Sequence, residues 1–409
     1  MKKIFPYKWE LVFWLFIAFF FNQADRQIFN VLLLDIQNDL GLTPDKMGLV
    51  GTALILVNGL LLPVAGLLGD RISKKWILVG ALLLWSTATM LTGLSTGLPA
   101  LILLRSVATG GGEAFYTPSA NKLISENHPV ETRATALSVH QAALYTGFIV
   151  SGVIATTIAG LWGWRHAFYL FGGAGVVLAL ILAWRIRPDA APASEATPEP
   201  VGRLMKDGLK AFFTSPTALL LALAGAGFQF SGQGFLLWMP TCLQDGFGVS
   251  PTRAAFDASF YPQLASICGV LLGARLADRY VGKHFRARLW VQAAGFLAGA
   301  PFFYWIGAAT TETLVCAAMA GYGFFKGFYD SNIFASIYDV IDSRYRAMAT
   351  SFILMFSLII ASASPYLLGV LKPVMGLSGG MKLMSGVYLL SVVPILCAIF
   401  FTSRKEMGR

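Results

Sequence analysis

The chain has 409 residues, of which 56% are hydrophobic and only 13% are charged. Soluble globular domains carry about 25% charged residues, so the composition excludes an ordinary soluble protein and indicates one that lies largely in lipid. Apolar windows of about 20 residues, long enough to cross a bilayer as helices, recur along the whole chain. We count twelve, centred roughly on residues 22, 57, 85, 111, 147, 174, 230, 265, 296, 325, 357 and 391. The sequence therefore predicts an all-α membrane protein with twelve transmembrane helices.

The net charge of +10 follows the alternation of these windows. With both termini inside, most Lys and Arg fall in the inside segments. The outside segments hold only Lys46, Arg165, Arg253, Lys372 and Lys382. This asymmetry is the positive-inside rule, and it predicts cytoplasmic termini in a multi-pass protein of the cell inner (plasma) membrane. Since topology explains the basic balance, we expect no nucleic-acid partner. The basic start, MKKIFPYKWELVFWLF, runs into a full-length span and is interpreted as a retained first helix.

Two of the spans contain charged residues. The first, from about residue 9 to 34, holds Asp25 and Arg26, and the fourth, from about 98 to 124, holds Arg105 and Glu113. A charge in hydrocarbon costs from a few to roughly 10 kcal/mol, and such residues usually serve a function. We expect the four side chains to face a water-accessible cavity, to pair with one another, and to bind or relay a charged species. A permanent structural ion pair, Arg105 with Glu113 or with Asp25, is the alternative.

The chain divides into two halves that echo each other. The stretch 185–210 is rich in Pro, Ala and Glu and is typical of a flexible cytoplasmic linker. We therefore predict an N-terminal six-helix bundle at 1–186, a linker at 187–212 and a pseudo-symmetric C-terminal bundle at 213–409. GLLGDRISKK (66–75) is repeated as GARLADRYVGK (273–283), and Glu131-Thr-Arg133 as Asp342-Ser-Arg344. Duplicated halves of this kind are a recurring transporter architecture.

The repeated loops predict a gate. An acidic side chain at a cytoplasmic helix end can accept from the N-terminal amides of a helix in the opposite half. Such a latch would close the cytoplasmic side without binding substrate. The residues assigned to gating are Asp70, Arg71, Asp278, Arg279 and Arg133.

The loop pattern G-x-x-x-D-R-x-x-[GS]-[RK]-[RK], present twice, resembles the signature of the major facilitator superfamily. Within it, Asp25-Arg26 with LLLDIQNDLGLT (32–43), and LLRSVATGGGEAFYTPSANK (103–122), resemble the anion:cation symporter family. Spinster-type lysolipid transporters share the same pattern. The resemblance implies the major facilitator fold and a secondary active transporter working by alternating access. It would carry a small organic anion, a sugar acid such as a hexuronate, aldonate or sialic acid, by proton-coupled symport. The alternative is a Spinster-like carrier of lysolipids or other amphiphiles.

Residue roles follow from this resemblance and from side-chain chemistry. Arg26 would grip the substrate carboxylate, because a guanidinium binds it bidentately and keeps its proton. Asp25, Glu113 and Arg105 would couple protons to transport, and the glycines at 110–112 are expected to bring Glu113 close to the first helix. Other candidate substrate contacts are amides and rings suited to sugar-like ligands: Gln23, Gln141, Tyr145, Gln233, Tyr329 and Asn332.

Lys326 and Asp330 lie four residues apart, on one helix face, as a structural pair or as part of the cavity wall. A membrane enzyme would need a nucleophile–base pair or a metal cluster at membrane depth. The four Cys and four His show no ligand spacing, and no phosphate- or dinucleotide-binding loop occurs. We therefore expect no enzyme, cofactor or metal. The expected partners are an anionic substrate, protons and the lipid bilayer, bound by a monomer.

Overall fold

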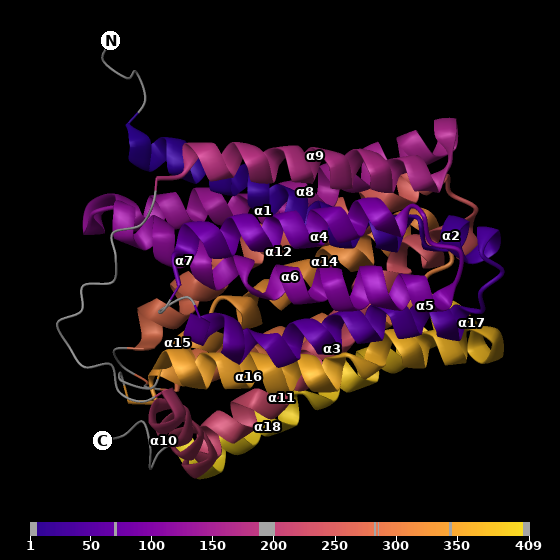
Figure 1. Ribbon diagram of the computed structural model, residues 1–409. Helices are drawn as coiled ribbons and strands as arrows, with labels where there is room; N and C mark the ends of the chain where they lie inside the picture. Colours follow the sequence, from indigo (N-terminus) through magenta and orange to yellow (C-terminus); the bar gives the residue numbers. More distant parts are fainter. Residues whose placement is uncertain are drawn as a thin grey trace. The chain divides into compact units, whose positions relative to one another are not determined.

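The structure is a computed structural model that describes residues 6–68, 72–187, 201–281, 284, 286–342 and 346–403. All regular secondary structure in these ranges is helical (Figure 1). Eight helical stretches are long and apolar enough to cross a membrane by length and composition. They are Pro44–Ala65, Lys74–Thr92, Glu131–Trp162, Trp164–Arg185, Pro216–Phe247, Pro251–Val281, Ala287–Ala308 and Met348–Thr402. The prediction of an all-helical membrane protein is confirmed.

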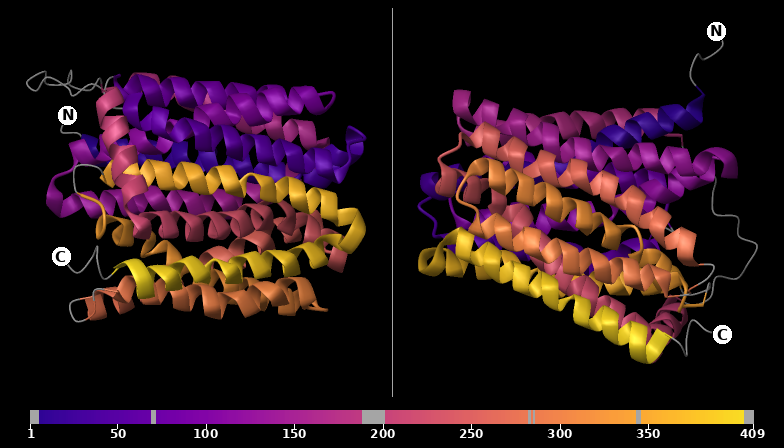
Figure 2. Two further views of the ribbon diagram at one scale, coloured as in Figure 1. Left: turned by 90° about the horizontal axis from the view of Figure 1, so that it is seen from below. Right: turned by 180° about the vertical axis from the view of Figure 1, so that it is seen from behind.

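The last of these stretches contains two crossings. At 55 residues and 1.5 Å of rise per residue it would be far longer than a bilayer core is thick, about 30 Å. The chain reverses within helix α17 (Ala363–Leu390), where Gly376 has φ 67° and ψ 170°. Few residues other than glycine adopt this conformation. Figure 2 shows the yellow part of the chain turning back at this point.

Three further crossings have a less apolar composition, because they carry the charged residues. The first is α1 (Tyr7–Val31), with Asp25 and Arg26. The second runs through α5 (Leu98–Leu101), the π-helix η1 (Ile102–Thr109), α6 (Gly110–Ala114) and α7 (Tyr116–Asn127). The third is α14 (Glu312–Asp330), continued after a break by α15 (Ile333–Tyr338). With them the described residues account for the twelve predicted crossings.

The chain forms two compact units. Unit 1 comprises Met1–Thr197 and Ser250–Phe256. In it α1 packs along α8, and α4 along α9. Small residues permit this approach: a Cβ at Gly172 of α9 would lie 2.3 Å from the Met90 backbone nitrogen of α4. The remaining helices of unit 1 are α2 (Leu33–Asp39), α3 (Pro44–Leu68), α4 (Lys74–Thr92), α8 (Val130–Trp162) and α9 (Trp164–Arg185).

Unit 2 comprises Pro198–Val249 and Asp257–Arg409. Its core is aromatic: the Tyr329 ring lies 4.3 Å from Phe228 and 5.1 Å from Phe296, centroid to centroid. The helices not yet named are α10 (Val201–Thr214), α11 (Pro216–Phe247), α12 (Pro251–Val281), α13 (Ala287–Ala308), α16 (Arg346–Ala361), α18 (Val392–Cys397) and the π-helix η3 (Ala398–Thr402).

The two units meet in sequence at 197/198, inside the predicted linker. Residues 188–200 lie outside the described ranges. The later part of the linker was expected to be flexible, but it forms the helix α10. The helix packs on α16 and α11, and its Phe212 ring stacks on Phe356 at 5.8 Å. The difference arises because the later part of the linker has apolar residues at helical spacing. The Pro- and Glu-rich composition of the linker as a whole obscures this pattern.

Candidate functional site

The four intramembrane charges of unit 1 form two ion pairs. Arg26 Nε donates to Glu113 Oε2 at 2.6 Å. Arg105 Nη1 donates to Asp25 Oδ2 at 2.9 Å, and Nη2 donates to the Asp25 backbone oxygen at 2.7 Å. Adjacent residues on a helix point about 100° apart, so Asp25 and Arg26 reach different partners on the fourth crossing. The expectation that the four charges pair with one another is met, and of the two bridges considered for Arg105 the structure has the one to Asp25.

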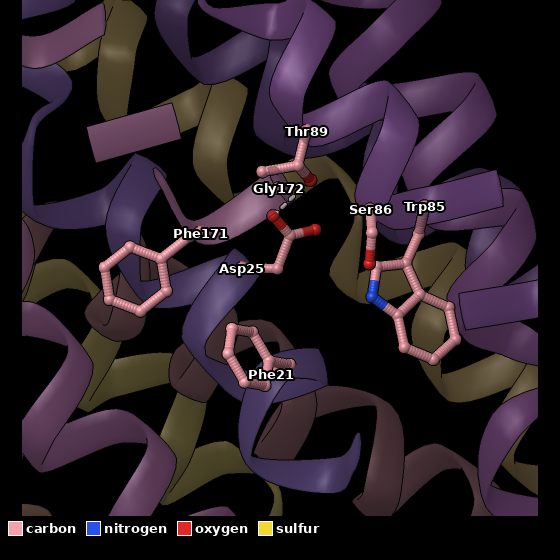
Figure 3. Close-up of a pocket in the computed structure, with 7 residues that line it drawn as sticks. All are labelled: Phe21, Asp25, Trp85, Ser86, Thr89, Phe171 and Gly172. Carbon is pink, nitrogen blue, oxygen red and sulfur yellow. Dashed lines mark hydrogen bonds between the residues drawn. The ribbon is translucent and has the colours of Figure 1, made fainter. Parts of the chain in front are cut away.

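The Asp25–Arg105 pair is deeply buried, and both carboxylate oxygens of Asp25 accept hydrogen bonds. Asp25 is 3% exposed and Arg105 1%. The Thr89 hydroxyl of α4 donates to Asp25 Oδ1 (Figure 3), so each carboxylate oxygen receives a donor. The Arg105 guanidinium lies 5.4 Å from the centre of the Phe29 ring. Charge-assisted hydrogen bonds of this kind are roughly twice as strong as those between neutral groups. The pair joins α1, α4 and η1.

The Arg26–Glu113 pair is less complete. The Glu113 side chain is 0% exposed, whereas that of Arg26 is 27% exposed. Glu113 Oε1 is buried without a hydrogen-bond partner among the described residues. Within the same ranges, no hydrogen bond from either Nη of Arg26 is found. A guanidinium has five donors, so the edge that carries the two Nη atoms remains available for a second carboxylate.

The π-helix η1 (Ile102–Thr109) carries Arg105. The Thr109 hydroxyl donates to the Leu104 carbonyl five residues back at 2.9 Å. A regular α-helix turns 100° per residue, which would set Arg105 and Glu113 about 80° apart, and π turns change that rotation. Such segments occur frequently at functional sites. The residue pattern contains no signal for η1, and sequence reasoning missed it.

The triple glycine allows the expected close approach to other helices, but these are α3 and α4 and not the first helix. A Cβ at Gly110 would lie 2.9 Å from the Leu54 carbonyl oxygen of α3, and one at Gly112 would lie 3.1 Å from the Ala81 carbonyl oxygen of α4. At Gly111 the nearest atom, in the flexible side chain of Leu61, is 3.7 Å away. The glycines therefore seat α6 against α3 and α4, and this position lets the longer Glu113 side chain reach α1.

The remaining predicted contacts of unit 1 differ in burial. Gln23 is buried one turn before Arg26, and its amide donates to Asn22 Oδ1 at 2.7 Å. On α8, Tyr145 is half-buried and Gln141 is exposed. His140 of the same helix is buried in the core, with Nε2 3.1 Å from the Tyr116 hydroxyl. Gln23 therefore lies beside the charged cluster, whereas the structure does not connect Gln141 with it.

The predicted contacts of unit 2 are mostly internal. Gln233 is half-buried on α11. Tyr329 belongs to the aromatic core, and Asn332 is 2% exposed. The Asn332 amide donates to the Phe328 carbonyl at 3.0 Å and to the Gly273 carbonyl at 3.4 Å. Asn332 thus satisfies backbone groups at the break between α14 and α15, a use that a motif cannot reveal. Lys326 and Asp330 form the expected ion pair, with side chains 26% and 31% exposed.

The predicted gating residues stay a prediction. Asp70 and Arg71 lie outside the described residues. Asp278 Oδ1 lies 3.9 Å from Arg288 Nη2, and Arg288 Nη1 pairs with Asp339 Oδ2 at 2.6 Å. Arg279 and Arg133 are exposed. Asp278 therefore has a partner within its own unit.

Comparison with known proteins assigns the chain to a family. The family model described as Major Facilitator Superfamily matches residues 15–365. The chain is 26% identical over 361 residues to "Probable anion transporter 4, chloroplastic" of Oryza sativa subsp. japonica. That match covers 84% of this chain and three fifths (60%) of the rice protein. It is 24% identical over 392 residues to the "Hexuronate transporter" of Bacillus subtilis (strain 168), covering 93% of this chain and 91% of that protein.

Among solved structures, a bacterial homologue of the human lysosomal transporter Spinster matches with a TM-score of 0.81 at 20% identity. The match covers 98% of both chains, and at this identity it shows the fold alone. These relatives are transporters and not enzymes. The chain contains two copies of the signature loop and twelve crossings, and the family model matches most of its length. It therefore belongs to the Major Facilitator Superfamily.

Proposed function

We propose that this transporter imports a small organic anion, a sugar acid such as a hexuronate, aldonate or sialic acid, together with protons. The two six-helix halves, 1–186 and 213–409, would rock to expose the site to each side in turn. The observation that carries the proposal is the Arg26–Glu113 pair, in which a buried carboxylate and a partly exposed guanidinium are held by one hydrogen bond. The anion and hexuronate transporters among the relatives support the substrate class.

Coupling follows from competition for Arg26. Glu113 and a substrate carboxylate are both ligands for the same guanidinium. A proton on Glu113 removes its charge and weakens its hold, which frees Arg26 for the substrate. After the substrate leaves, Glu113 loses its proton and pairs with Arg26 again. Proton and anion therefore bind together and leave together, which is the thermodynamic condition for symport.

Asp25 would take a second proton in this scheme. Its charge is held by Arg105 and Thr89, so protonation would loosen the brace between α1, α4 and η1. In a cell inner membrane with cytoplasmic termini, the more acidic outside would load Asp25 and Glu113, and the higher internal pH would discharge them. Substrate accumulation inside follows from this order.

The test is uptake of radiolabelled glucuronate, a hexuronate, into proteoliposomes that hold the purified protein. An inward pH gradient should drive accumulation above the external concentration, and a proton uncoupler should abolish it. Counterflow at equal pH, which needs a carrier but no gradient, serves as the control for insertion. Accumulation that is insensitive to the uncoupler would contradict proton coupling.

A second candidate is a Spinster-like carrier of lysolipids or other amphiphiles. The fold likeness to a Spinster homologue favours it, as does an open apolar groove of about 520 Å³ on unit 2. Four residues that line this groove are Leu223, Phe230, Ile360 and Leu390. Thermal stabilisation of the purified protein by lysophosphatidylcholine, with no effect of glucuronate at pH 5.5 or 7.5, would select this candidate over the sugar-acid symporter.

A further inference from the structure

A small cavity borders Asp25. Its volume is about 10 Å³, and it is lined by residues of α1, α4 and α9 of unit 1 (Figure 3). Phe21, Trp85 and Phe171 form its apolar walls, with Gly172 beside them. The remaining lining residues are polar: Asp25, Thr89 and Ser86. Three polar groups therefore converge on a small space with apolar walls, as they do in a binding site.

The Ser86 hydroxyl has no hydrogen-bond partner in the described part of the chain. Ser86 is 3% exposed, and no hydrogen bond from its hydroxyl is found among the described residues. In Figure 3 its oxygen and the second carboxylate oxygen of Asp25 point toward the same space. The neighbouring helix leaves room here because position 175 is glycine: a Cβ there would lie 2.2 Å from the Ser86 oxygen. The hydroxyl can therefore bond to a partner inside the cavity.

The chemistry of the cavity selects its occupant. A volume of about 10–15 Å³ holds one water, which needs two to four polar partners. Ser86, Thr89 and the Asp25 carboxylate supply three. A metal cation is disfavoured, because the Arg105 guanidinium already lies 2.9 Å from the Asp25 carboxylate and would repel it. The occupant is therefore neutral, small and able to donate as well as accept.

We infer that one water molecule occupies this cavity and passes protons to Asp25 from the α4 and α9 side, separately from the Arg26–Glu113 pair. The inference rests on the proposed function and adds a second proton route to it. A proton that arrives binds the water oxygen, and one of the water's own O–H bonds breaks as its proton goes to an Asp25 oxygen. The water is neutral again, and Asp25 becomes a carboxylic acid. Ser86 is a positioning residue in this step.

The charged surroundings of Asp25 are compatible with this route. Arg105 reaches it from η1, and the Arg26–Glu113 pair lies on the α6 side. The lining residues of α4 and α9 carry no charge. On α8, the titratable His140 stacks on Phe19 at 4.8 Å. A proton therefore meets no cation among the residues that line the cavity.

Substitution of Ser86 tests the inference in transport. Ser86→Val fills the space with methyl groups and excludes water, and Ser86→Ala removes one of the water's partners. Loss of one such hydrogen bond corresponds to about tenfold, so we expect gradient-driven glucuronate uptake to fall about tenfold in Ser86→Val with counterflow at equal pH unchanged. Thr92→Val is the matched control, because the Thr92 hydroxyl bonds only to the Ala88 carbonyl of its own helix. An equal loss of driven uptake and counterflow, or no loss of either, overturns the inference.

An infrared measurement decides the question even if no sugar acid is carried. The purified protein, labelled with ¹³C-aspartate, is titrated with acid, and the Asp25 carboxylate band is identified by difference from Asp25→Asn. Thr89→Val, which removes a donor from the same carboxylate, identifies the band if Asp25→Asn does not fold. The band should shift in Ser86→Val and remain in place in Thr92→Val. An unshifted band in Ser86→Val, or a band in the wild type that responds to Na⁺, overturns the inference.

Discussion

Replacement of Glu113 by glutamine isolates the proton-carrying step. The amide keeps the size of the acid and can still accept from Arg26 Nε, which lies 2.6 Å from Oε2, but it carries neither charge nor exchangeable acid proton. The bond from Arg26 to a neutral amide is still charge-assisted, but it lacks the attraction between two opposite charges, which is about 1 kcal/mol at 4 Å even in bulk water. Glu113 should therefore hold Arg26 about 1–1.5 kcal/mol more tightly than glutamine does.

This difference predicts a specific pattern. In Glu113→Gln a substrate carboxylate competes with a weaker ligand, so its affinity at pH 7.5 should rise about tenfold and lose its pH dependence. In the wild type affinity should rise as the pH falls, because protonation of Glu113 releases Arg26. Gradient-driven accumulation should be abolished in the variant, while counterflow persists. Glu126→Gln is the matched control, since Glu126 lies on the same crossing in a surface pair with Lys74, Oε2 to Nζ 3.1 Å.

The assays are glucuronate binding to the purified protein across pH and uptake into proteoliposomes. Undiminished gradient-driven accumulation in Glu113→Gln would refute the reasoning, because coupling would then proceed without this acid. Loss of counterflow together with net uptake would indicate that Glu113 has only a structural role.

Three further predictions concern stability. Asp25→Asn leaves Arg105 buried without a counter-charge and should destabilise the purified protein by about 3–5 kcal/mol, whereas Asp245→Asn, which changes an exposed carboxylate paired with Lys372, should change the melting temperature little; equal melting temperatures would contradict a buried pair. Gly110→Ala and Gly112→Ala place a methyl against backbone and should each cost about 1–3 kcal/mol, while Gly111→Ala, where the nearest atom is 3.7 Å away, should be neutral; an equal response at all three sites in a thermal melt would disprove the assigned seating of α6. At the end of α2, the Arg165 hydrogen bond holds the pKa of Asp39 below its usual value, so this carboxylate stabilises the fold above its unfolded-state pKa and loses that effect as pH falls through its lower folded-state pKa. Wild type and Asp39→Asn should therefore differ slightly in melting temperature at pH 7 and converge below the folded-state pKa of Asp39, and a difference that grows on acidification would reverse the assigned sign.

Much of the architecture could be predicted from the sequence, because each feature either recurs along the chain or places charge in the membrane at a high free-energy cost. Apolar windows at membrane length fix the crossings, and the doubled Asp-Arg loops indicate two related halves. The same logic identified Asp25, Arg26, Arg105 and Glu113, since few chains keep ionised residues inside apolar spans without using them.

The pairing within the site could not be predicted, because it depends on local backbone geometry. Arg105 lies on the π-helix η1, and nothing in ILLRSVAT distinguishes a π-helix from an α-helix. Glycines at 110–112 indicate close packing but not the partner, which is α3 and α4. Thr89 is one of many hydroxyls in apolar helices, and only the folded arrangement places it on Asp25.

The exchange of Glu113 for a substrate carboxylate on Arg26 is tested most directly by counting protons. Calorimetric titration of the purified protein with glucuronate, at one pH in buffers of different ionisation enthalpy, gives the number of protons taken up on binding. At a pH where Glu113 is ionised in the free protein, the wild type should take up close to one more proton than Glu113→Gln. Identical proton uptake by the two proteins would contradict the proposed mechanism.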